Sequence, residues 1–193
     1  MVALLRFRDG PPACPQVQCS ACSALCTLFE AAGAALEPHI AEILTSMRAC
    51  FGAYGIKSTM ILIDAIGTLA DSVGSSLAEP EFSELYLPAV FALLRGREDT
   101  DMHLFPILEC LSSVCPAVGL EMAPYAQELY LRCLKLAGNT MAANAANVED
   151  APVKDFAICG LDVGKNHLLA STFTSKWKCW QICICIYGCN NWN

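Results

Sequence analysis

The stretch Asp64-Ala-Ile-Gly-Thr-Leu69 decides the fold, because closely similar stretches stand on both sides of it. Ser23-Ala-Leu-Cys-Thr-Leu28 lies 41 residues earlier, and Pro106-Ile-Leu-Glu-Cys-Leu111 lies 42 residues later. In each stretch the apolar residues recur at positions that share one face of a helix. The chain therefore repeats a helical unit at a nearly constant spacing.

Hydrophobic spacing on both sides of these stretches predicts further helices, separated by glycine and proline signals. The expected helices are 20–31, 39–54, 58–73, 81–95, 102–114, 123–137 and 153–162. A helix pair that recurs every 40–47 residues or so is typical of HEAT and armadillo arrays, in which neighbouring pairs cover each other's apolar faces. The sequence predicts an all-α fold, an α-solenoid of HEAT-type antiparallel helix pairs with about three and a half repeats. An ordinary helical bundle with chance internal similarity is the alternative.

The chain divides into three segments by composition. Residues 1–16 form an irregular N-terminal segment, 17–162 the HEAT-repeat segment, and 163–193 a Cys- and Trp-containing tail that we expect to be disordered. Val163-Gly-Lys165 can be encoded by a splice-donor-like sequence, and Pro15-Gln16 by an acceptor-like one. We therefore expect both ends to be intron-derived or mispredicted, which leaves a complete protein and a truncated or mis-spliced product as open alternatives.

Composition excludes several classes of protein. The chain has 193 residues with 12 Lys+Arg against 19 Asp+Glu, a net charge of -7, which argues against nucleic-acid binding because phosphates attract basic clusters. Hydrophobic residues make up 55% and charged residues 16%, which excludes a wholly disordered chain. The apolar run near the C-terminus is too short for a membrane span, and the N-terminus lacks the apolar run of a secretory signal. We expect no membrane partner and reduced thiols.

Four acidic residues follow the repeat and form the candidate site. Asp64 and Asp71 are seven residues apart, so they share one helix face. Glu30 aligns with Asp71, and Glu109 aligns with Gly67 on the same face as Asp64. Three stacked helices would thus carry a negative track, hereafter the acidic stripe (Glu30, Asp64, Asp71 and Glu109). A solvated helix face without a binding role is the alternative.

The 13 cysteines allow two interpretations. Cys19, Cys22 and Cys26 have the i, i+3, i+7 spacing of a packed helix face, which favours structural cysteines. Together with Cys14 they also have the look of a zinc or iron–sulfur run, and the tail cysteines 179, 183, 185 and 189 could hold a soft metal. We favour packing and expect no metal.

Catalysis finds no support in the sequence. His39, His103 and His167 are scattered, and none accompanies a nucleophile motif. No phosphate-binding loop of the form G-x-x-x-x-G-K is present. We expect neither an enzyme nor a cofactor, and hence no catalytic residues.

The residues from Leu62 to Gly74 (LIDAIGTLADSVG), followed by Pro80-Glu-Phe82, resemble transportin, the importin beta-2 class of nuclear import receptor. The stretch from Leu104 to Val114 (LFPILECLSSV) is a second long match, and shorter matches extend the resemblance over 17–162. The resemblance implies a HEAT-repeat superhelix, a protein of cytoplasm and nucleus. Its partners would be cargo proteins with basic proline–tyrosine nuclear localisation signals, Ran GTPase and nuclear pore proteins.

The resemblance also implies a role for the acidic stripe. The family's acidic inner-face residues fall on Glu30, Asp64, Asp71 and Glu109, where they would pair with basic residues of the signal. The family's pocket for the proline–tyrosine pair, and its main Ran site, belong to repeats outside the resembling segment. Apart from the resemblance, Glu98, Asp99 and Asp101 lie between two expected helices, and a solvated loop is the favoured interpretation of these three, with an addition to the negative field as the alternative. Alternatives are a HEAT scaffold without cargo binding, a truncated non-functional product and a Cys-rich metal binder.

Overall fold

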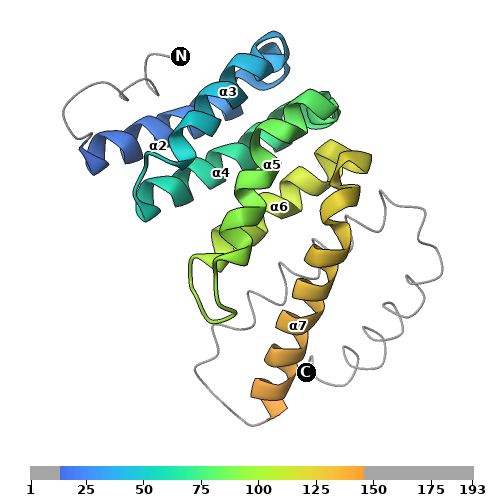
Figure 1. Ribbon diagram of the computed structural model, residues 1–193. Coiled ribbons are helices and arrows are strands. Elements are labelled where there is room, and N and C mark those ends of the chain that lie inside the picture. The colour runs from blue at the N-terminus through green and yellow to red at the C-terminus, as the bar shows by residue number, and fades with distance from the viewer. Residues whose placement is uncertain (1–13, 146–193) are drawn as a thin grey trace.

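The computed structural model describes residues 14–145, and within that range the regular elements are all helical. Figure 1 labels the α-helices, and a short 3-10 helix, named η, follows each of α2, α4 and α6. In chain order they are α2 (Pro15–Ala32), η1 (Gly33–His39), α3 (Ile40–Phe51), α4 (Ile56–Val73), η2 (Gly74–Leu77), α5 (Pro80–Arg95), α6 (Leu104–Val118), η3 (Gly119–Tyr125) and α7 (Ala126–Ala145).

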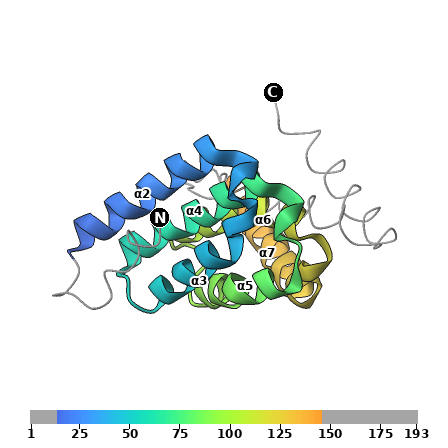
Figure 2. The same cartoon turned by 90° about the horizontal axis from the view of Figure 1, so that it is seen from above.

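The helices form pairs, α2 with α3, α4 with α5, and α6 with α7, and each pair packs against the next (Figure 1). Helix α4 packs between α2 and α6, and these three form one layer of the array. Helices α3 and α5 contact each other in a second layer, and Figure 2 shows α2 and α4 lying over them. The three aligned sequence stretches are thus the three helices of the first layer. The prediction of an all-α, HEAT-type solenoid is confirmed, while its last helix, 153–162, lies outside the described residues.

Each first-layer helix ends in the same way. Gly33, Gly74 and Gly119 follow α2, α4 and α6 with φ angles of 52°, 54° and 56°. A residue with a Cβ is strained in this left-handed region, whereas glycine is not. Each glycine N–H donates to the carbonyl four residues earlier, and a 3-10 turn then leads toward the second layer. The helix end predicted at Gly33 is confirmed.

Helices α2, α6 and α7 extend several residues beyond one predicted end, while α4 and α5 begin only two residues and one residue earlier than predicted. Helix α2 begins at Pro15, inside the segment assigned as irregular, because proline suits the first turn, where the N–H has no intrahelical partner. Helix α6 continues through Pro116 to Val118, since burial of Val118 and its neighbours holds the turn that proline would otherwise disrupt. Helix α7 extends to Ala145 instead of 137. The rest of the N-terminal segment and the whole tail lie outside the described residues.

The hydrophobic core runs through all the described repeats. Its largest fully buried side chains are Tyr86, Phe29, Phe91, Leu25, Ile40, Leu44, Met47, Leu62, Ile63, Ile66 and Leu69. Five cysteines are buried as well, namely Cys22, Cys50, Cys110, Cys115 and Cys133. Burial raises the pKa of Cys22, and likewise of Cys115, to about 12. These thiols stay protonated at neutral pH and fill the core as small apolar groups, as the helical spacing of Cys22 predicts.

Three stretches of the described chain are long and apolar enough to cross a membrane, judged by length and composition alone. They are Pro15–Phe51, Ile56–Leu77 and Leu104–Asn139. The expectation of no membrane span rested on the two ends of the chain, and these three stretches lie between them. In the structure each stretch includes a 3-10 helix, so none is one continuous α-helix. The apolar composition of the second and third stretches matches a layer whose helices are packed on several sides, since about half of each is buried.

The hydroxyl of Tyr86 is an unsatisfied polar group in the core. The side chain is fully buried on α5, and its Oη has no hydrogen-bond partner among the described residues. Burial raises the pKa of Tyr86, and the nearby Cys110 and Cys115 thiols raise it further. We expect Tyr86→Phe to leave the free energy of unfolding unchanged or to raise it by about 1 kcal/mol, because the desolvation penalty disappears.

Urea unfolding followed by circular dichroism measures this effect. Tyr54→Phe is the matched control, because the Tyr54 hydroxyl is hydrogen-bonded to Cys50 and its removal should lower stability. A clear loss of stability in Tyr86→Phe would contradict the assignment of an unsatisfied hydroxyl.

Candidate functional site

The acidic stripe lies on the first layer of the array. Glu30 is on α2, Asp64 and Asp71 are on α4, and Glu109 is on α6, and all four side chains are exposed. The three helices are neighbours, with α4 in the middle. The structure therefore places the predicted residues on three adjacent helices, as the repeat alignment requires.

The middle of the stripe is set by a close approach of two helices. A Cβ on Gly67 would lie 3.3 Å from the Cα of Cys110, which is tighter than an ordinary van der Waals contact. The missing side chain lets α4 and α6 come together at this point. Glu109, next to Cys110 in the chain, is thereby brought near Asp64. The pKa of Glu109 is raised by partial burial and, after that, by the negative charge of Asp64.

The aspartates of α4 receive hydrogen bonds from neutral groups. Ser113 Oγ on α6 donates to Asp71 Oδ2 at 2.9 Å. On the other side, the Cys26 thiol on α2 donates to Asp64 Oδ2 at 3.8 Å. The pKa of Cys26 rises to about 11, through burial first and the charge of Asp64 second. Neutral donors orient the carboxylates without cancelling their charge.

Glu30 is the member of the stripe that the structure does not join to the others. It makes no hydrogen bond or ion pair with another described residue. The described contacts thus group Asp64, Asp71 and Glu109 around Gly67, with Glu30 apart on the neighbouring helix. Within the described range, no carboxylate of the stripe is paired with a lysine or arginine.

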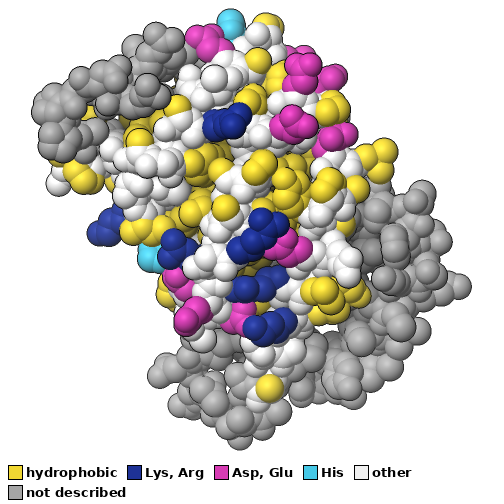
Figure 3. Space-filling model, viewed as in Figure 1, with side chains coloured by type: hydrophobic (Ala, Val, Ile, Leu, Met, Phe, Trp, Pro, Cys, Tyr) yellow, Lys and Arg dark blue, Asp and Glu magenta, His cyan; other side chains and the backbone are white. Residues whose placement is uncertain are grey.

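Positive charges gather elsewhere in the described chain. Lys57, in the first turn of α4, is the only described lysine or arginine on a first-layer helix. The others are Arg48, Arg95, Arg97, Arg132 and Lys135, on α3, α5, α7 and the loop between α5 and α6. Figure 3 shows lysine and arginine side chains gathered near α7 and that loop. The charges are thus segregated, and the acidic stripe keeps its negative field.

Acidic residues of the α5–α6 loop behave differently from the stripe. Asp99 forms ion pairs with Arg132 Nε at 2.8 Å and with Lys135 Nζ at 2.7 Å. Asp101 pairs with Arg97 at 3.1 Å. The alternative that both aspartates add to the negative field is therefore wrong, because local cations neutralise them.

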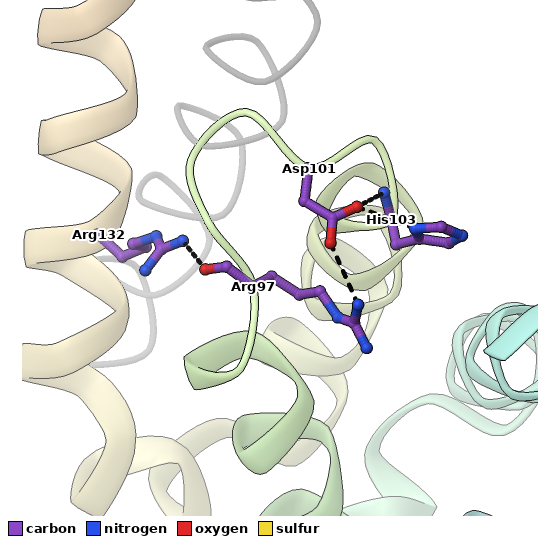
Figure 4. A network of polar contacts seen from close by, with 4 residues as sticks. All are labelled: Arg97, Asp101, His103 and Arg132. Carbon is purple, nitrogen blue, oxygen red and sulfur yellow. Dashed lines mark hydrogen bonds and ion pairs between the residues drawn. The ribbon is translucent and has the colours of Figure 1, made fainter.

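A hydrogen-bond network of Arg97, Asp101, His103 and Arg132 holds the α5–α6 loop in place (Figure 4). The pKa of Asp101 falls to about 2, chiefly because its carboxylate accepts the His103 main-chain N–H, then through the His103 ring and Arg97. Arg132 on α7 donates to the Arg97 carbonyl. The loop thereby ties α7 to the preceding repeat.

Sequence reasoning missed most of this network. Arg97 and Asp101 have an i,i+4 spacing that could have been noticed, but Arg132 lies 35 residues from Arg97. That separation becomes a contact only when successive repeats stack. No group of three or more His, Cys, Asp or Glu side chains in the part of the chain that the structure describes is placed to hold a metal ion.

The chain is similar in sequence to several known proteins. No protein-family model matches it. Transportin-1 of Mus musculus is 44% identical over 153 residues, which cover 77% of this chain and 17% of the relative. The chain is homologous to one segment of transportin. Transportin-1 of Homo sapiens is 42% identical with the same coverage, and Importin subunit beta-2 of Schizosaccharomyces pombe is 39% identical.

These comparisons confirm the resemblance to transportin inferred from the sequence. The chain spans 17% of the length of these transportin relatives.

Proposed function

We propose that the described repeats are the peptide-binding part of a nuclear import receptor and that the acidic stripe binds an extended basic peptide. The peptide would be the basic segment of a proline–tyrosine type nuclear localisation signal on a cargo protein. The observation that carries the proposal is a row of exposed carboxylates on one layer, unpaired with any described cation. Homology to transportin supports the choice of cargo.

The proposed mechanism is recognition without a chemical step. Lysine or arginine side chains of the peptide would lie beside Asp64, Asp71 and Glu109, where charge-assisted hydrogen bonds form. The stripe's field would speed the encounter and set the register of the peptide. A receptor of this kind works in both cytoplasm and nucleus, and Ran and nuclear pore proteins would be its further partners. Their binding sites are not assigned to described residues.

Fluorescence anisotropy with a labelled peptide tests the proposal. The peptide carries several arginines and lysines followed by a proline–tyrosine pair, and the control peptide has glutamine at every basic position. We expect binding of the basic peptide alone, weakening steeply as salt rises, because exposed charges are screened. Equal binding of both peptides, or none at high micromolar protein, would refute the proposal and favour a scaffold role.

Peptide affinity should also depend on pH through Glu109. Because the pKa of Glu109 is raised, this carboxylate takes up a proton earlier than an ordinary glutamate as pH falls. A cationic peptide favours the ionised form, so affinity should be full at neutral pH and decline as pH drops. Anisotropy titrations from about pH 7.5 to about pH 5.5 measure the effect.

Glu109→Gln is the control for this pH dependence. It removes the titrating group, so its affinity should be lower at neutral pH and flatter across the range. An unchanged pH profile in Glu109→Gln would contradict a contact between Glu109 and the peptide.

A further inference from the structure

Asp64 and Asp71 are two negative charges that α4 holds at a fixed separation. Both side chains are exposed, and they stand seven positions apart on the same helix. A helix rises about 1.5 Å per residue and makes nearly two full turns in seven residues, so the two carboxylates leave one side of α4 about 10 Å apart. Most residues between them are buried against other helices, which keeps this part of α4 in place.

Contacts with both neighbouring helices orient the two carboxylates. Asp71 accepts a hydrogen bond from Ser113 of α6 at 2.9 Å, and Asp64 accepts one from the Cys26 thiol of α2 at 3.8 Å. These neutral donors restrict the carboxylates before a ligand arrives, and groups that are already ordered bind at a lower entropic cost. Glu109 adds a second negative charge near Asp64; its pKa is raised by partial burial first and by the charge of Asp64 second.

We propose that α4 selects peptides in which two basic residues stand three positions apart. The inference rests on the proposed function, because it specifies which basic peptides the acidic stripe binds. In a polyproline II helix three residues make one turn and rise about 9 Å, so side chains at i and i+3 point the same way at nearly the separation of Asp64 and Asp71. Proline favours this conformation, and a signal of the proposed proline–tyrosine type contains one.

Other spacings of the basic residues fit the two aspartates less well. In a β-strand, side chains on one face are two or four positions apart, which spans about 7 Å or about 13 Å and misses the separation on α4. Adjacent basic residues point to opposite faces of a strand. A mismatched peptide keeps one ion pair and loses the other, which lowers affinity about three- to fivefold for exposed charges.

Competition against the labelled basic peptide of the anisotropy assay tests the spacing at low salt. The competitor peptides share one composition of arginines, glutamines and prolines, end in the same proline–tyrosine pair, and differ only in the spacing of their two arginines. We expect the full chain to bind the peptide with arginines three positions apart about three- to fivefold more tightly than the others. Because every competitor has the same net charge, a difference between them reports spacing alone.

A variant that moves one carboxylate along α4 gives a sharper test. Asp71→Asn with Thr68→Asp keeps the net charge and places the second carboxylate four positions from Asp64, about 6 Å along the helix. The preferred spacing of the arginines should then shift from three positions to two, which span about 7 Å in an extended peptide. Glu30→Gln is the matched control, since Glu30 lies on α2, apart from the other stripe residues. It should leave the preferred spacing at three.

The results separate a failure of the spacing from a failure of the proposed function. Equal affinity for every spacing would overturn selection by α4 and leave recognition of basic peptides intact. A preference that stays at three positions in the variant with Thr68→Asp would also overturn it, and circular dichroism of each variant shows that the helices are retained. If the labelled peptide itself does not bind, the proposed function is refuted, and the inference that rests on it is refuted too.

Discussion

Reversing two charges of the acidic stripe, Asp64→Lys with Asp71→Lys, should weaken binding of the basic peptide about tenfold or more. Exposed ion pairs contribute up to about 1 kcal/mol each, and a lysine at each position adds repulsion to the lost attraction. A factor of ten in affinity corresponds to about 1.4 kcal/mol, which two reversed sites together reach. The dissociation constant from anisotropy measures the effect at low salt, where screening is weakest.

The matched control is Glu42→Lys with Glu84→Lys. These exposed acids lie on α3 and α5 in the second layer, and the control changes the net charge by the same amount. We expect it to alter affinity far less than the stripe variant. If both double variants weaken binding equally, net charge governs the interaction and the stripe is not the site.

Removing the ring of Phe91 should have the largest effect on stability. Phe91 on α5 is 0% exposed and stacks on Tyr125 of η3, with ring centroids 4.3 Å apart and an interplanar angle of 22°. Phe91→Ala leaves a cavity between α5 and the turn that precedes α7. Substitutions of this kind cost about 3–5 kcal/mol, which is a large part of the stability of an ordinary domain.

Urea unfolding followed by circular dichroism measures the loss. Phe82→Ala on the same helix is the matched control, because Phe82 is only partly buried and should cost clearly less. Leu120→Ala, at a side chain that is 73% exposed, should change stability by less than about 0.5 kcal/mol. Equal losses in Phe91→Ala and Phe82→Ala would show that the stacked pair is not a centre of the core.

Helix positions and repeat architecture were accessible from the sequence because they rest on local spacing. The apolar residues of α4 recur at helical intervals, and Gly33 marks the end of α2. Helix ends were less accessible. The continuation of α6 past Pro116 depends on burial of Val118 against other elements, and that tertiary contact outweighs the local preference of proline.

The acidic stripe was found because repeat alignment converts sequence distance into spatial order. Repeat alignment could not show that Gly67 brings Glu109 near Asp64, since that approach depends on the distance between two helix axes. The alignment also could not show that Arg132 and Lys135 neutralise the charge of Asp99. Loop charges find partners according to loop conformation, which residue type alone does not determine.

The stacking of α2 on α4 and of α4 on α6 has a consequence for how the chain folds. Most contacts join elements within one repeat or in successive repeats, so few residues must meet across long stretches of chain. The stacked helices close loops of about one repeat, and the entropic cost of closing a loop grows only slowly with its length. Folding of this array can begin at whichever repeat nucleates first and then spread in both directions. During synthesis, we expect neighbouring helix pairs to pack together as soon as both have left the ribosome.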